Sequence, residues 1–169
     1  FKKLIALITS FFIVEQAASA NEANGDKILL NTSKGEVIIG LMPEIAPVHV
    51  ARIVELVKSG FYDGIIFHRI IPGFMAQTGD PKGNGTGGSG TNLKAEFSDY
   101  KYINGTVGMA RTMDPNSADS QFFICFDGCG HLTGQYTVWG QVETGMEVVE
   151  ALNVGEPPAA VSYTHLRAH

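Results

Sequence analysis

Charge, cysteine and long apolar runs are all scarce in this 169-residue chain, and each scarcity excludes a class of protein. The charged fraction is 17%, below the usual quarter, and the net charge of −5 argues against a broad nucleic-acid-binding surface. Only two cysteines, Cys125 and Cys129, are present, and no paired cysteine or histidine motif accompanies them, so a zinc site is not expected. A bridge at this spacing would be strained if the strand stays extended, so a bridged and an unbridged pair both stay open.

The most apolar run, residues 4–14, is too short for a comfortable membrane span, which needs roughly 20 residues. Two lysines precede it, and residues 18–20 (Ala-Ser-Ala) form a small-x-small cleavage site. This pattern is typical of a secretory signal peptide over residues 1–20, with Asn21 as the first mature residue. We therefore expect an exported protein without a stable membrane anchor; an uncleaved anchor is the alternative.

After a flexible stretch at 21–26, short apolar runs alternate with turn residues, and the glycine count of 20 favours a β-rich single domain. Residues 27–31 and 36–41, separated by a four-residue turn, predict a β-hairpin. A helical period with Pro47 in its first turn predicts a helix over 48–59. The remaining elements are expected as strands around Arg69 and over 106–110, 121–125 and 136–142, and as a short helix over 146–153. This pattern favours a closed antiparallel β-barrel whose ends the two helices cover.

Arg69 stands in the apolar run 67–80, where a buried charge is costly unless it is partnered. A structural ion pair is one explanation, and a functional site is the other. Gln77 and Gln121 add uncharged polar groups near the aromatic Phe123. This set contains no base and no nucleophile, so it suits chemistry in which no bond to a heavy atom is made.

Other chemistries have weaker support. Residues 83–88 formally match a dinucleotide-binding fingerprint, but no helix follows and no βαβ unit surrounds them. The five histidines lack metal-ligand spacing, except that the last two stand at i and i+4, and these two have no third ligand. No Gly-x-Ser-x-Gly elbow is present for nucleophilic hydrolysis.

Four motifs, in matching order and spacing, resemble the cyclophilin family of peptidyl-prolyl isomerases. They are residues 67–80, 85–88, 120–124, and 132–134 followed by 138–140. The resemblance covers about residues 28–153. It implies an eight-stranded antiparallel barrel capped by two helices, and it implies isomerisation of X-Pro bonds without a cofactor or metal.

By this resemblance, Arg69 and Gln77 are the catalytic residues: Arg69 donates towards the prolyl nitrogen and carbonyl, and Gln77 holds the substrate backbone. The same resemblance implies substrate contacts at Phe74, Met75, Ala110, Arg111, Gln121, Phe123, His131, Leu132 and Tyr136. The expected clients are proline-containing unfolded or partly folded polypeptides in a bacterial periplasm, with a monomer as the default state. A non-catalytic module or holdase that grips proline-containing segments is the alternative function.

The chain also departs from the family pattern. His131 stands where the best-known members carry a tryptophan that bears on cyclosporin binding, so the resemblance does not extend to cyclosporin sensitivity. Arg111 stands where asparagine is common, which adds a cation near the groove, and Tyr136 stands where histidine is common. Residues 161–169 do not resemble a cyclophilin end. We therefore expect the isomerase domain over 27–160, an atypical tail over 161–169 that a foreign read-through would explain, and a last strand that is missing or replaced.

Overall fold

The computed structural model describes residues 26–153 and 160–167, so the expected signal peptide and its cleavage site lie outside the described residues. The predicted hairpin is confirmed: β1 (Lys27–Thr32) pairs antiparallel with β2 (Gly35–Leu41). The first predicted helix is α1 (Pro47–Lys58), which buries His49, Val50, Ile53, Leu56 and Val57 along one face. In the described part of the chain, no helix is long and apolar enough to cross a membrane.

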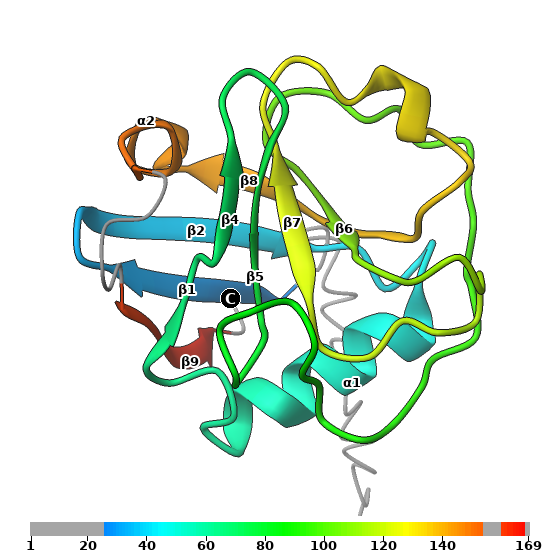
Figure 1. Ribbon diagram of the computed structural model, residues 1–169, viewed down its shortest axis with the longest axis horizontal. Coiled ribbons are helices and arrows are strands. Elements are labelled where there is room, and N and C mark those ends of the chain that lie inside the picture. The colour runs from blue at the N-terminus through cyan, green and yellow to red at the C-terminus, as the bar shows by residue number, and fades with distance from the viewer. Residues whose placement is uncertain (1–25, 154–159, 168–169) are drawn as a thin grey trace, which may run out of the picture.

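The other elements follow the predicted order and type, with two exceptions: a short 3-10 helix, η1, that the pattern did not indicate, and a last strand, β9, that was expected to be missing or replaced. They are β3 (Ile65–Ile66), β4 (Arg69–Ile71), β5 (Met75–Thr78), β6 (Thr106–Met109), β7 (Phe122–Cys125), η1 (Gly130–Leu132), β8 (Val138–Thr144), α2 (Met146–Glu150) and β9 (Ala160–Arg167). The strands form one curled antiparallel sheet in the order β3-β9-β1-β2-β8-β6-β7-β5-β4, and α1 and α2 lie at opposite ends of it (Figure 1).

The sheet has nine described strands instead of the expected eight, because one strand is broken. Its two end strands, β3 and β4, are consecutive in the chain and are separated only by Phe67 and His68. At the break, the Ile66 carbonyl accepts a hydrogen bond from the Thr78 hydroxyl at 2.8 Å. Phe67 therefore turns into the core, while Arg69 stays exposed, and the two side chains do not share a face.

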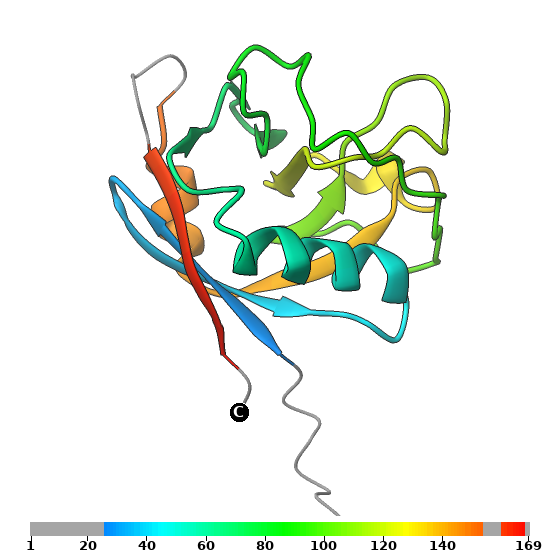
Figure 2. The ribbon, with the colours of Figure 1, turned by 90° about the horizontal axis from the view of Figure 1, so that it is seen from below.

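Of the two alternatives for the last strand, missing or replaced, the structure excludes a missing strand. β9 lies between β1 and β3, with Lys27 opposite Arg167 and Ile65 opposite Val161 in the two registers (Figure 2). Strand pairing uses backbone N–H and C=O groups, so a segment without regular side-chain alternation can still cover two open sheet edges. β9 thereby connects β1 to β3 in the wall of the barrel.

Strand β7 separates two apolar clusters because successive side chains on a strand point to opposite faces. Phe122 and Ile124 join the main core, which also holds Trp139. Phe123 and Cys125 face the other way, into a smaller cluster of Met75, Tyr102, Cys129, Leu132 and Val138. Residues of this smaller cluster form the bottom of the candidate site.

Candidate active site

The strand registers bring the central predicted residues into one row across the sheet. Arg69 on β4 lies opposite Gln77 on β5, and Gln77 lies opposite Phe123 on β7. Residues directly opposite each other on antiparallel strands share a face and lie close together. The row continues to Gly108 on β6, where a Cβ would collide with the Tyr102 hydroxyl and the Phe123 ring. A glycine at this place leaves room for the aromatic side chains that support the site.

A groove of about 610 Å³ opens above this row. Phe74, which follows the Pro-Gly turn between β4 and β5, stacks on His131 of η1 with ring centroids 5.5 Å apart. Phe123 packs edge-on against Tyr136 at 5.8 Å. The lining residues are Arg69, Phe74, Met75, Gln77, Ala110, Arg111, Met113, Phe123, His131, Leu132, Gln135 and Tyr136. The groove therefore combines aromatic and aliphatic side chains with polar ones, and the Arg69 guanidinium stands at one of its edges.

A chain of hydrogen bonds orients that guanidinium. Arg69 Nη1 donates to Gln77 Oε1 at 3.1 Å, and Gln77 Nε2 donates to Gln121 Oε1 at 2.9 Å. Gln121 Nε2 in turn donates to the carbonyl oxygens of Gly85 and Gly87. Each glutamine amide in this series of hydrogen bonds accepts through its oxygen and donates through its nitrogen. The direction of every bond in the series is therefore defined. Among the described residues Arg69 has no ion-pair partner, which argues against the structural ion pair considered above.

The second cation of the groove, Arg111, is held against the opposite wall. Its guanidinium carbon lies 4.4 Å from the centroid of the Tyr136 ring. Its Nη2 and Nε donate to the Gln135 carbonyl, and its Nη1 donates to the Thr112 carbonyl at 2.9 Å. These contacts fix the Arg111 side chain as part of the wall while leaving its positive charge uncompensated by any of them.

The glycine-dense loop after β5 is folded around a carboxylate. Asp80 is 1% exposed and accepts hydrogen bonds from the backbone N–H groups of Lys82, Asn84 and Gly85. Burial by itself raises the pKa of Asp80, but these backbone donors outweigh it and hold the pKa below its usual value. Because the backbone donors that a phosphate would need already bind Asp80, the nucleotide interpretation of this loop loses its basis.

The histidine beside Arg69 also has a shifted pKa. Burial lowers the pKa of His68; the Asp80 charge opposes this shift, and the Arg69 charge adds to it. His68 is therefore neutral near pH 7, and Arg69 keeps the positive charge at this end of the groove. No cluster of three His, Cys, Asp or Glu side chains that could hold a metal ion occurs in residues 26–153 and 160–167.

The structure brings together every residue predicted for the site. All of them line the groove except Gln121, which joins it through Gln77 and lines an adjoining cavity of about 260 Å³ beside the glycine loop. Sequence reasoning missed Met113 and Gln135, which also line the groove. Met113 is 96% exposed in a segment described from sequence only as a polar loop, and nothing in its local pattern indicated a place at the rim.

The comparison with protein families identifies the class of this chain. Residues 27–164 match the sequence model of the family described as cyclophilin type peptidyl-prolyl cis-trans isomerase/CLD. The chain belongs to this family, and it is a cyclophilin-type peptidyl-prolyl cis-trans isomerase. The family implies proline-containing peptides as substrates.

Relatives with known names are consistent with this class. The chain is 49% identical over 154 residues to a probable peptidyl-prolyl cis-trans isomerase of Brucella suis, covering 84% of this chain and 78% of the relative. It is 43% identical over 130 residues to a peptidyl-prolyl cis-trans isomerase of Synechococcus elongatus, covering 76% of this chain and 89% of that protein.

Solved structures show the same fold. The crystal structure of a Cryptosporidium parvum cyclophilin type isomerase, in the presence of the dipeptide Ala-Pro, superimposes with a TM-score of 0.74 at 28% identity, covering 85% of this chain and 98% of that one. A cyclophilin from Hirschia baltica gives a TM-score of 0.72 at 27% identity, covering 90% of this chain and 79% of that one.

Proposed function

We propose that the groove accelerates rotation about X-Pro bonds in folding proteins by stabilising the twisted peptide, with Arg69 as the donor and the apolar hollow as the proline pocket. Rotation about a peptide bond costs ~18–20 kcal/mol because resonance shares the nitrogen lone pair with the carbonyl. In the twisted state that lone pair is localised on nitrogen and can accept a hydrogen bond. The catalyst therefore needs a donor aimed at the nitrogen and no proton transfer.

The arrangement of Arg69 carries this proposal. Its side chain is exposed at the edge of the groove, and its one hydrogen bond to a described residue is the bond to Gln77. The guanidinium has five N–H donors in a rigid fork, so the remaining donors are free to face a substrate. Phe74, Phe123 and Leu132 supply an apolar hollow beside it for the proline ring.

The second cation suggests a preference among clients. Arg111 lines the same groove, and its bonds to carbonyl oxygens do not neutralise its charge. We expect it to favour acidic residues near the proline in substrates, an effect that salt screens.

Turnover by an Arg69→Ala variant tests the catalytic role. Loss of one preorganised donor from an oxyanion hole lowers kcat by roughly 10²–10³, and we expect a similar fall here in a protease-coupled proline-turnover assay. Arg52→Ala is the matched control, because Arg52 lies on α1 and pairs with Glu55 and Ser89, outside the groove. Undiminished turnover by Arg69→Ala would refute the catalytic role of Arg69. Peptide binding without turnover in the parent would instead leave a proline-binding module or holdase as the function.

We further propose that this isomerase is exported to a bacterial periplasm. The signal-peptide pattern in residues 1–20 supports this location. The bridge between Cys125 and Cys129 supports it independently, since disulfides persist mainly in oxidising compartments.

A further inference from the structure

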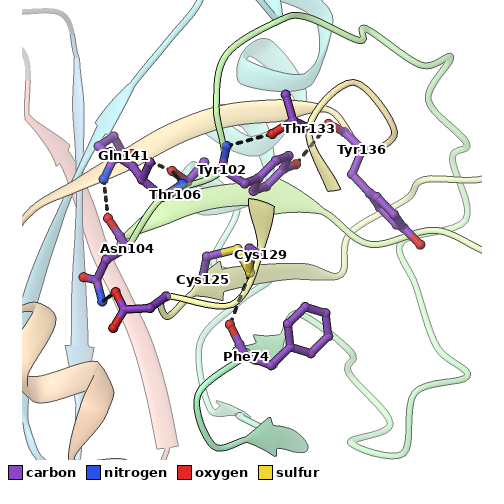
Figure 3. The surroundings of a disulfide bond; sticks show 11 residues. Phe74, Tyr102, Asn104, Thr106, Cys125, Cys129, Thr133, Tyr136 and Gln141 are labelled. Atoms are coloured by element: carbon purple, nitrogen blue, oxygen red, sulfur yellow. Dashed lines mark hydrogen bonds between the residues drawn. A yellow bond between two sulfur atoms is a disulfide. The ribbon is translucent and has the colours of Figure 1, made fainter. Parts of the chain in front are cut away.

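The disulfide lies directly behind the proposed proline pocket. Cys125 and Cys129 are bridged, with their Cα atoms 6.0 Å apart, and both side chains are buried in the smaller apolar cluster (Figure 3). Cys125 is the last residue of β7, and Cys129 is the residue immediately before η1. The bond therefore joins the end of one pocket element to the start of another.

These two elements carry opposite parts of the pocket lining. Phe123 stands two residues before Cys125 and shares its face of β7. Leu132 stands three residues after Cys129, and its N–H donates to the Cys129 carbonyl at 2.9 Å. Closing the bridge thus limits how far Leu132 can move from Phe123.

The bridge also contacts the third side of the pocket. Cys129 Sγ lies 3.2 Å from the carbonyl oxygen of Phe74, as the dashed line in Figure 3 marks. A bridged sulfur has no proton, so this is a packing contact and not a donated hydrogen bond. The Gly128 N–H donates to the Gly73 carbonyl at 3.0 Å, which holds the same loop beside the turn that carries Phe74.

Without the bridge, the backbone around Cys129 is held by hydrogen bonds and packing but by no covalent cross-link. Glycines flank it on both sides, and glycine has more conformational freedom than any other residue. Gly128 is sterically required, because a Cβ there would lie 2.6 Å from the Gly73 oxygen. At Gly130, by contrast, a Cβ would have nothing within 4 Å, so no packing reason restricts that position to glycine.

The far end of the η1 turn is anchored independently of the cysteines. The Tyr102 N–H donates to the Thr133 hydroxyl at 3.2 Å, and the Tyr102 hydroxyl donates to the Tyr136 carbonyl at 3.0 Å (Figure 3). The turn is therefore held at residues 133–136 by hydrogen bonds and at residue 129 by a covalent bond, with the pocket residues His131 and Leu132 between these anchors.

We propose that Cys125 and Cys129 are positioning residues of the isomerase, whose disulfide holds η1 against β7 and sets how tightly the proline ring is gripped. This inference rests on the proposed role of the groove. A dithiol reductant opens the bridge by thiol–disulfide exchange: the S–S bond breaks, two protein thiols form, and the reductant is oxidised to its own disulfide, with two electrons and two protons transferred. The freed turn then loses part of its contact with the pocket.

Opening the bridge should weaken substrate binding and leave the rate of the rotation step nearly unchanged. Arg69 and Gln77 lie on β4 and β5, outside the cross-linked loop, and their hydrogen bonds do not involve η1. We expect reduction to raise KM for an X-Pro peptide about three- to tenfold while kcat stays within about twofold, the pattern of a lost uniform binding contribution.

The test compares oxidised and dithiothreitol-reduced protein, with the thiol count confirmed by mass spectrometry, at a temperature well below unfolding. The double variant Cys125→Ala, Cys129→Ala gives the same comparison without a reductant. Adding Gly130→Ala to it should recover part of the KM loss, because alanine restricts the backbone that the bridge no longer restrains.

A bridge that only stabilised the fold would lower the melting temperature and leave KM unchanged, and that result would overturn the proposal. A fall in kcat equal to the rise in KM would overturn it too. If the double variant fails to fold, reduction of the folded parent still decides the question. Because the oxidised parent and Arg69→Ala are assayed alongside, failure of the proposed catalytic role is distinguishable from failure of this inference.

Discussion

Replacing Gln77 by glutamate tests the directed hydrogen-bond chain that holds Arg69. In the parent, Gln77 accepts from Arg69 at 3.1 Å and donates to Gln121 Oε1 at 2.9 Å. A glutamate keeps the acceptor but has no donor, so a carboxylate oxygen would face Gln121 Oε1. Gln121 cannot relieve this by rotating its amide, because its Nε2 already donates to two backbone carbonyls at 3.0 and 2.9 Å.

The size of the effect follows from two contributions. Loss of the hydrogen bond between Gln77 and Gln121 costs about 1 kcal/mol. The new carboxylate also forms an ion pair with the Arg69 guanidinium, and an exposed ion pair contributes a further ~0.2–1 kcal/mol. This ion pair partly neutralises the positive charge of Arg69. At 1.36 kcal/mol per tenfold change in rate, we expect kcat/KM for an X-Pro peptide to fall roughly seven- to thirtyfold.

Salt separates the electrostatic part from the loss of hydrogen bonds. At about 1 M salt the Debye length is only about 3 Å, so part of the loss in Gln77→Glu should be recovered in the protease-coupled assay. Gln77→Met is the matched control, since it removes the hydrogen bonds without adding a charge and should show no such recovery. Parent-like turnover by Gln77→Glu at low salt would refute the role given to this hydrogen-bond chain, and a loss that is insensitive to salt would refute its electrostatic part.

Two further predictions concern stability and location. The folded-state pKa of Asp80 is held below 3.8, so its contribution to stability is present above about pH 4 and is lost as the pH falls through the lower folded-state pKa. Denaturant unfolding should therefore show Asp80→Asn less stable than the parent by about 1–3 kcal/mol near pH 7, with the gap narrowing below pH 4; a gap that stays constant with pH would contradict this. Expression of the full chain in a bacterium, with cell fractionation and N-terminal sequencing, should yield periplasmic protein that begins at Asn21, and a cytoplasmic product retaining residues 1–20 would argue against export.

Much of the fold could be read from local pattern because its elements are short and bounded by turns. Pro47 at the start of a 3.6-residue period predicted α1, and the turn residues between two apolar runs predicted the hairpin of β1 and β2. The broken strand at Phe67 and His68 was not predictable in this way, since the residue before the break accepts a hydrogen bond from Thr78, which stands in another strand. β9 was missed for a related reason: its pairing with β1 and β3 depends on open sheet edges that only the folded barrel presents.

The sequence by itself determined the family, through the motif at residues 67–80, and with it the residues that meet in the groove. The tertiary structure alone decided how those residues face one another. Strand register placed Arg69, Gln77 and Phe123 in one row, and strand pairing at long range is not encoded in any short stretch. The bend after β7 brought Cys129 back to Cys125, which extended strand geometry would have kept apart. Types of side chain are local properties of a sequence, whereas distances between them are set by the packing of the whole chain.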